Sequence, residues 1–228
     1  MNKKHVLMST VAAAAVMSAA VISVQTTLAA DEPPAPMTFF VTNTSQTGNL
    51  GGLAGADAIC QRLAQAAGSP ANRTWRAYLS TQGPGAVNAR DRIGTGPWHN
   101  ANGVRIAANV ADLHGDDERD RNYIVAETAL DESGNTILGR IGRPEGTRNE
   151  HDIITGSDSH GMALTDGMDG TCMNWTSASD DARAMVGHHD RSGGNTTSWN
   201  SAHRSPGCSV AGLQRSGGAG HFYCFATN

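Results

Sequence analysis

The chain has 228 residues, of which 39% are hydrophobic, only 17% are charged and 27 are glycines. A charged fraction this far below the usual quarter, with so much glycine, excludes a coiled coil and an acidic disordered tail and indicates a loop-rich globular domain. The formal net charge is -4, and both lysines, Lys3 and Lys4, stand at the extreme N-terminus. Nucleic acid is excluded as a partner, because phosphate binding needs a positive surface.

The first thirty residues have the layout of a secretory signal peptide. A cationic head (residues 1–5) precedes an apolar stretch (residues 6–24), and Leu28-Ala29-Ala30 then meets the acidic Asp31. A transmembrane anchor is the alternative, because the apolar stretch is about long enough to span a bilayer, but the small-residue exit favours cleavage. We expect an exported bacterial protein, periplasmic or extracellular, with no membrane span after residues 1–30 are removed.

Export determines how the cysteines are interpreted, because disulfides form in oxidising compartments. The four cysteines, Cys60, Cys172, Cys208 and Cys224, include no Cys-x-x-Cys pair, which disfavours a zinc ribbon or a thioredoxin-like site. An even number of cysteines in an oxidising compartment indicates two disulfides. Four cysteines allow three pairings, and their spacing does not choose among them.

The first half of the chain contains the clearest periodic signals. A stiff, proline-containing linker (residues 31–36) precedes a β-rich run, residues 37–42, which predicts the first strand. Apolar residues at three- and four-residue spacing predict a helix over residues 53–67, with Cys60 on its apolar face. A second strand over residues 74–80 follows, and a short helix over residues 107–113 is expected to end at Gly115.

The second half has shorter signals separated by turns. Residues 122–126 form a candidate strand, and residues 131–135 form a turn cluster. A long region rich in glycine and aspartate, residues 149–181, is interrupted only by Ile153-Ile154, and the last strand is expected over residues 221–226. There is no internal repeat and no second linker, so one domain over residues 37–228 is the economical interpretation.

These segments resemble a known family. The run FFVTNTSQTGNLGGLAGADAICQRLAQAAG, followed by TWRAYLS and later by TCMNWTS and HFYCF, is similar to the endostatin domain and to bacterial endostatin-like domains. Both belong to the C-type-lectin-like fold. The strongest features are Gly55-Ala56-Asp57 just before Cys60, Cys172-x-x-Trp175 and Tyr223-Cys224-Phe225.

The resemblance implies an α+β fold with two helices packed on small mixed or antiparallel sheets, long loops and adjacent termini. It also implies nested disulfides, Cys60 with Cys224 and Cys172 with Cys208. The calcium-binding triplet of sugar-binding C-type lectins does not occur, and no histidine stands between Asp31 and Trp98. The calcium-bridged sugar site and the zinc site of endostatin therefore do not carry over.

One acidic segment is a candidate calcium site. Four oxygen-bearing side chains alternate as in an EF-hand loop, which suits calcium: Asp116, Glu118, Asp120 and Asn122. The sixth position holds Arg121 where the sharp turn needs glycine, so a solvated acidic turn is the alternative. No other cofactor is expected.

The long loop region of the C-type-lectin-like fold supplies the remaining candidates for ligand binding. They are Asp166 and Asp169, for which turn formation is the alternative, and the aromatic and polar group Trp175, Trp199, Asn200 and His203. Trp175 is expected in the core, because tryptophan is mostly buried. The segment His188-His189-Asp190 is interpreted as a surface loop, because adjacent histidines on a strand point to opposite faces.

Sequence signatures of the common enzyme classes are absent. The sequence therefore predicts an exported, non-catalytic binding module that recognises a glycan or a protein through its long loop region. Two alternatives stay open: a secreted enzyme on a C-type-lectin-like scaffold, with one of His188, His189 or His203 beside a carboxylate, and a structural protein of the envelope without a small ligand.

Overall fold

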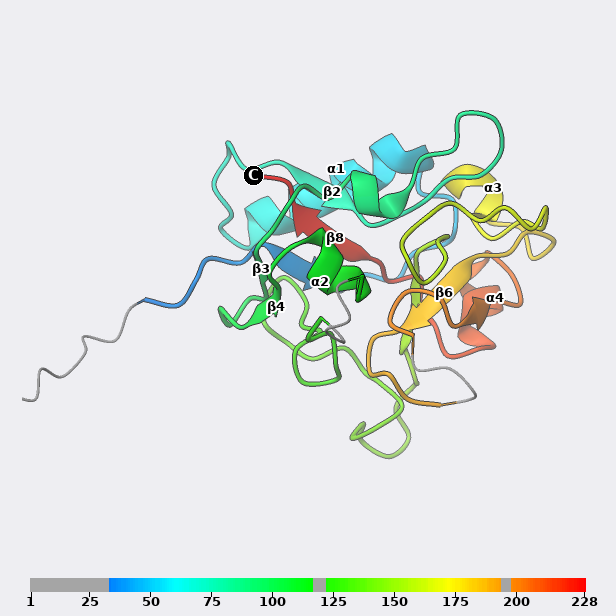
Figure 1. Ribbon diagram of the computed structural model, residues 1–228. Coiled ribbons are helices and arrows are strands. Elements are labelled where there is room, and N and C mark those ends of the chain that lie inside the picture. Colours follow the sequence, from blue (N-terminus) through cyan, green and yellow to red (C-terminus); the bar gives the residue numbers. More distant parts are fainter. Residues whose placement is uncertain (1–32, 117–121, 194–197) are drawn as a thin grey trace, which may run out of the picture. The chain divides into compact units, whose positions relative to one another are not determined.

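The computed structural model describes residues 33–116, 122–193 and 198–228 (Figure 1). The helices and strands all belong to one compact unit, Pro34–Asn228. The expected signal peptide and the first two residues of the expected linker lie outside the described residues. None of the helices in the described ranges is long and apolar enough to cross a membrane.

The architecture of the described residues is mixed α+β, with three small antiparallel sheets. The first sheet has the order β1-β8-β2, and Figure 1 shows β8, in red, between the other two strands. The second is the hairpin β3-β4, and the third has the order β5-β6-β7. The strands are β1 (Phe39–Val41), β2 (Trp75–Ala77), β3 (Trp98–His99), β4 (Arg105–Ala107), β5 (Asp152–Ile154), β6 (Met185–His188), β7 (His203–Arg204) and β8 (Tyr223–Ala226).

Four α-helices and one 3-10 turn complete the described part of the chain. They are α1 (Gly52–Ala66), the 3-10 turn η1 (Ala89–Asp91), α2 (Val110–His114), α3 (Cys172–Trp175) and α4 (Val210–Gln214). Only α1 is long. Its buried face, which includes Ala56, Cys60 and Leu63, repeats every three to four residues and packs on β2.

Two disulfides join distant parts of the chain. Cys60 in α1 is bonded to Cys224 in β8, and Cys172 in α3 is bonded to Cys208, just before α4. The pairs are 164 and 36 residues apart in sequence, which is the nested arrangement that the resemblance implies. All four cysteines are buried in one hydrophobic core.

The Gly55-Ala56-Asp57 segment of α1 has a separate structural reason for each residue. A Cβ on Gly55 would lie 1.9 Å from the carbonyl oxygen of Leu50, so only glycine fits there. Ala56 is fully buried. The carboxylate of Asp57 accepts hydrogen bonds from the guanidinium of Arg92 and from the backbone N–H of Ala77 in β2. This segment therefore fixes α1 against the first sheet.

The expected helix over residues 53–67 and the first, second and last expected strands are present, each strand shorter than predicted. The second helix begins three residues later than expected, at Val110, because residues 105–107 form β4 and the Asn109 side chain accepts a hydrogen bond from the N–H of Asp112. It ends at His114, before Gly115 in the left-handed conformation (φ 70°).

The prediction of a strand over residues 122–126 is wrong. This segment is irregular, because its polar groups bond locally or across to another loop. The Asn122 side chain donates to the carbonyl of Leu113 and accepts from the N–H of Ile124. The guanidinium of Arg191 donates to the carbonyl of Ile124. The turn cluster over residues 131–135 is present, closed by hydrogen bonds to the Asp131 carboxylate.

Candidate functional site

Residues within 163–174, in the segment where the sequence predicts the long loop region, line a cavity of about 580 Å³ at the surface together with residues within 82–86. The volume lies within the range of small ligand-binding pockets. Two segments line it, one after β2 and one that leads into α3; the lining residues are Gln82, Gly83, Ala86, Ala163, Leu164, Thr165, Gly167, Met168, Asp169, Thr171, Met173 and Asn174. This cavity is the clearest candidate site in the region where the sequence predicts binding.

One wall of the cavity is a left-handed turn. The four residues of α3 have φ values of 48°, 56°, 56° and 66°, from Cys172 to Trp175. An L-amino acid in this conformation costs about 1–2 kcal/mol, so four in succession persist only where the surroundings hold them. Conformations of this kind concentrate at functional sites.

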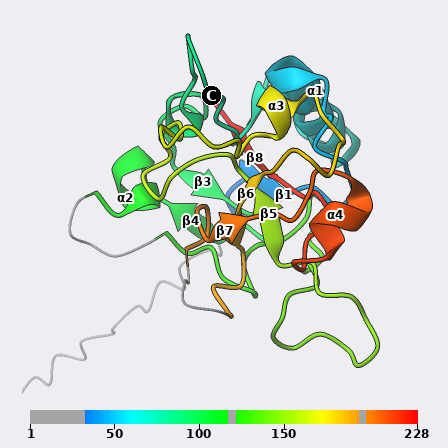
Figure 2. The same ribbon diagram turned by 90° about the vertical axis from the view of Figure 1, so that its right-hand side faces the viewer.

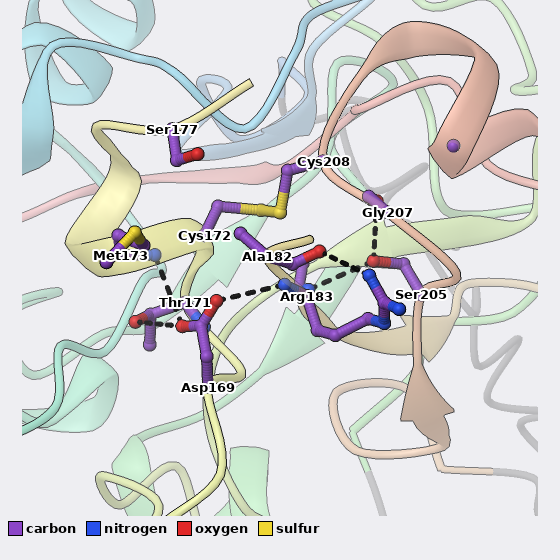
Figure 3. The surroundings of a disulfide bond; sticks show 12 residues. Asp169, Thr171, Cys172, Met173, Ser177, Ala182, Arg183, Ser205, Gly207 and Cys208 are labelled. Carbon is purple, nitrogen blue, oxygen red and sulfur yellow. Dashed lines mark hydrogen bonds between the residues drawn. A yellow bond between two sulfur atoms is a disulfide. The ribbon is translucent and has the colours of Figure 1, made fainter. Parts of the chain in front are cut away.

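The surroundings of the turn hold it from three sides. The Cys172–Cys208 disulfide fixes its first residue, and the indole N–H of Trp175 donates to the carbonyl of Ser80 at 2.8 Å. The Asp169 carboxylate accepts hydrogen bonds from the N–H groups of Met173 and, across the turn, of Arg183 (Figure 3).

The left-handed turn displays an apolar side chain at the mouth of the cavity. Met173 is 66% exposed and Met168, also in the lining, is 57% exposed. Two amide side chains of the lining already have partners: the Gln82 amide donates to the carbonyl of Met168, and the Asn174 amide bonds the backbone of Gln82 in both directions. The cavity therefore offers mainly apolar surface to a ligand.

The two predicted aspartates of the long loop serve the fold in this structure. Asp169 caps the left-handed turn as described. Asp166 is exposed and forms an ion pair of 2.7 Å with Arg204, whose guanidinium holds the pKa of that carboxyl below its usual value.

The predicted aromatic group does not form an exposed surface. Trp175 and Trp199 are both buried, so neither presents a ring face to a sugar. Asn200 is also buried, and its amide donates to the hydroxyl of Tyr78 and to the carbonyl of Asp158. Burial of both tryptophans counts against stacking of a sugar on this group.

His203 lies apart from the long-loop cavity, in a cluster of histidines around Asp152. Its Nε2 lies 3.6 Å from Asp152 Oδ1, and the Nε2 atoms of His151 and His188 lie 3.1 and 3.3 Å from the same oxygen. His151, Asp152 and His188 are buried, and their ligand atoms lie close enough together to hold a metal ion. Two of these histidines, His188 and His203, meet the carboxylate that the enzyme alternative requires.

The pKa values of several groups in the cluster are strongly shifted from their usual values. Burial lowers the pKa of His151, but the carboxylates of Asp152 and Asp190 outweigh it and raise this pKa to about 9. Burial raises the pKa of Asp152, but the surrounding imidazoles of His151, His188 and His203 hold it far below its usual range. The carboxylate of Asp152 also raises the pKa of His203. The site thus attracts positive charge to one buried oxygen.

The interpretation of His188-His189-Asp190 as a surface loop is wrong, because all three residues are buried. The two adjacent rings have different surroundings: His188 Nε2 lies 3.3 Å from Asp152 Oδ1, whereas burial lowers the pKa of His189 to about 4 and keeps its ring neutral. Neither His151 nor Asp152 is predicted as a site residue from the sequence. The only signal available was the adjacent pair itself, at the start of a short apolar run.

The calcium candidates lie partly outside the described residues, which include neither Glu118 nor Asp120. Asp116 forms an ion pair of 2.5 Å with Arg90, which lowers its pKa, and lies 3.3 Å from His160. Asn122 is buried and its side chain is hydrogen-bonded to the backbone. The two described candidates are thus occupied by protein partners in this structure.

No model of a known protein family matches the chain, and no curated protein matches it either.

Proposed function

We propose that this protein is an exported, non-catalytic binding module on an endostatin-like scaffold, and that the cavity of its long loop region binds an apolar segment of a protein partner. The observation that carries the proposal is the left-handed turn of α3, which is held by a disulfide and displays Met173 at the mouth of that cavity. Strained backbone that keeps an apolar side chain exposed lowers the stability of the fold, which favours a functional role for this turn.

The scaffold supports this assignment in three ways. The mixed α+β architecture with small sheets is compatible with the C-type-lectin-like class. The pairing of β1 with β8 brings the beginning and end of the domain together, as in endostatin-like domains. The nested disulfides fit an oxidising compartment, in agreement with the signal-like N-terminal sequence.

A protein ligand fits the cavity better than a glycan does. Sugar rings are bound by exposed aromatic faces, but of the chain's eleven phenylalanine, tyrosine and tryptophan residues only Tyr123 is exposed. Methionine is unbranched and polarizable and adapts to varied apolar surfaces, and it is common at protein-binding surfaces for this reason. The rim formed by Met168 and Met173 has this character.

The test is a selection of displayed peptides and a glycan array, both performed with the full, oxidised chain. We expect peptides with a large apolar side chain to be selected, and Met168→Asp and Met173→Asp to weaken their binding at least about tenfold, because a charge would enter an apolar contact. Ile141→Asp is the matched control: Ile141 is 64% exposed and lies outside the cavity.

Three results would contradict the proposal. Peptide binding that resists both methionine variants would place the ligand elsewhere on the protein. Binding on the glycan array that the methionine variants abolish would make the ligand a sugar. A selection that enriches no peptide would argue against a protein ligand in this cavity.

A further inference from the structure

The third sheet brings Asp152, His188 and His203 to one face. Asp152 in β5 pairs directly with His188 in β6, and Val186, two residues before His188, pairs with His203 in β7. Because side chains two residues apart on a strand point the same way, these three residues share a face. Figure 2 shows the three strands side by side. Register, and not sequence proximity, therefore assembles the group.

His151 adds a third imidazole from the residue before β5. Its ring stacks on that of His188, with ring centres 4.1 Å apart and planes at 10°. Its Nδ1 lies 3.1 Å from the carboxylate of Asp190, which in turn accepts a hydrogen bond from the N–H of Arg140. Asp190 therefore fixes the orientation of the His151 ring.

The hydrogen bonds determine which nitrogen of two rings is free. His151 Nδ1 faces an ionised carboxylate and His203 Nδ1 lies 3.1 Å from the carbonyl of Arg204, and both partners can only accept. The proton of each neutral ring is therefore on Nδ1, and the lone pair is on the Nε2 that faces Asp152 Oδ1. Lone pairs directed at a carboxylate oxygen repel it unless a proton or a metal ion lies between them.

Protons alone do not satisfy the buried polar atoms of this site. Neither oxygen of Asp152 and neither ring nitrogen of His188 has an aligned hydrogen-bond partner among the described residues, although all are buried. Protonating both stacked rings would put two positive charges about 4 Å apart in a buried place. One divalent cation satisfies the lone pairs and the carboxylate together.

The types of the candidate ligand atoms, and their distances from Asp152 Oδ1, indicate which ion would fit the cluster. Three imidazole nitrogens and one carboxylate oxygen suit zinc, whereas calcium prefers oxygen ligands throughout. Ligands about 2.0–2.1 Å from a tetrahedral zinc ion lie about 3.3 Å from one another. The three distances from Nε2 to Asp152 Oδ1 are 3.1, 3.3 and 3.6 Å.

We propose that this protein binds one Zn²⁺ through His151, Asp152, His188 and His203, with Asp190 as a positioning residue behind His151. Three ligands are buried, and the His203 side chain is 38% exposed, so the ion enters and leaves on that side. With four protein ligands the site is of the closed, structural kind. The ion would join β5, β6 and β7, whichever ligand the long-loop cavity binds.

The experiment is calorimetric titration of Zn²⁺ into the full, oxidised chain after treatment with a chelator. We expect one ion per chain, and an affinity at least about tenfold weaker in His203→Ala and His188→Ala. Asp190→Asn should weaken it about 10- to 100-fold, the usual effect of losing a partner behind a ligand. His160→Ala is the matched control, because it removes an exposed histidine that does not contact the cluster.

Co²⁺ provides a second measurement on the unaltered protein. We expect the intense visible absorption of a four-coordinate Co²⁺ ion, displaced by Zn²⁺ and changed in His203→Ala, whose partly exposed side chain makes a folding failure improbable. Absence of stoichiometric zinc binding would overturn the proposal, and so would affinities that are equal in the native protein and in His203→Ala.

Discussion

Asp57 and Arg92 form a nearly buried ion pair between α1 and the segment after η1: the guanidinium Nη2 of Arg92 lies 2.9 and 2.8 Å from the two carboxylate oxygens. A second arginine, Arg76, reaches the same carboxylate at 2.6 Å from the solvent side. One acidic group thus has one buried and one exposed partner, which allows the two contributions to be compared.

Removal of the two arginines is expected to have unequal effects. Arg92→Ala should lower the free energy of unfolding by about 3 kcal/mol, because the loss of one member of a buried pair leaves the other without its main partner. Arg76→Ala should cost less than about 1 kcal/mol, because the Arg76 side chain is 46% exposed, compared with 11% for Arg92. Urea unfolding of both variants tests this; equal losses would contradict it.

The left-handed turn is expected to cost stability that a glycine would restore. Met173→Gly should raise the free energy of unfolding by about 0.5–1 kcal/mol, because the 1–2 kcal/mol cost of this conformation for an L-residue exceeds the extra entropy of glycine in the unfolded chain. The same variant should lose affinity for peptides that occupy the cavity.

Asn174→Gly provides the comparison. It relieves the same kind of strain at the next residue (φ 56°) but removes the side chain that bonds the backbone of Gln82. We expect no gain in stability from it. Thermal unfolding distinguishes the two variants, and a loss of stability in Met173→Gly would show that the turn is not strained.

The inner disulfide should matter for both stability and binding. On the chain-entropy model, removing the Cys172–Cys208 bond, which spans 36 residues, costs about 4 kcal/mol, and removing Cys60–Cys224, which spans 164, costs about 5 kcal/mol. The double variant Cys172→Ala/Cys208→Ala should also weaken peptide binding, because the first residue of the left-handed turn is no longer fixed. If the outer pair weakened binding equally, the effect would be one of global stability.

Two of the three tyrosines should resist ionisation in alkali. Burial raises the pKa of Tyr78 and of Tyr223 far above the usual value, against weaker opposing effects of their neighbours. Because the folded pKa lies above the unfolded value of about 10, their contribution to stability is complete below that pH and is lost as the pH rises above it. Absorbance at the tyrosinate band should show at most one phenolate before unfolding begins; two or more in the folded protein would contradict this.

The parts of the fold that sequence predicts well are those with a regular period. Helix α1 was found because Ala56, Cys60 and Leu63 recur at helical spacing and Gly68 follows it. The prediction of a strand at residues 122–126 failed because the Asn122 side chain bonds nearby backbone groups. A β-rich composition does not reveal such local hydrogen bonds, which compete with strand pairing.

The histidine cluster could not be predicted, because Asp152, His188 and His203 lie on strands of two to four residues that carry no detectable period. Neighbouring residues on a strand point to opposite faces of the sheet, and this rule correctly places the side chains of His188 and His189 apart. It does not apply to His151, which precedes the strand that begins at Asp152.

The burial of this region also depends on a close backbone approach. A Cβ on Gly187 would lie 1.9 Å from the carbonyl oxygen of Trp199, so the segment that covers His188 packs directly on the glycine. Nothing in the local sequence shows that contact. The same is true of the cavity, where the wall depends on the conformation of Cys172 to Trp175.

The position of β8 at the centre of the first sheet has a consequence for biosynthesis. Phe40 in β1 and Ala77 in β2 both pair with Cys224, so neither strand has its partner until the ribosome has made almost the whole domain. Contacts this distant in sequence form slowly, so the first sheet is completed only at the end of synthesis, after the local contacts of α1 have become possible.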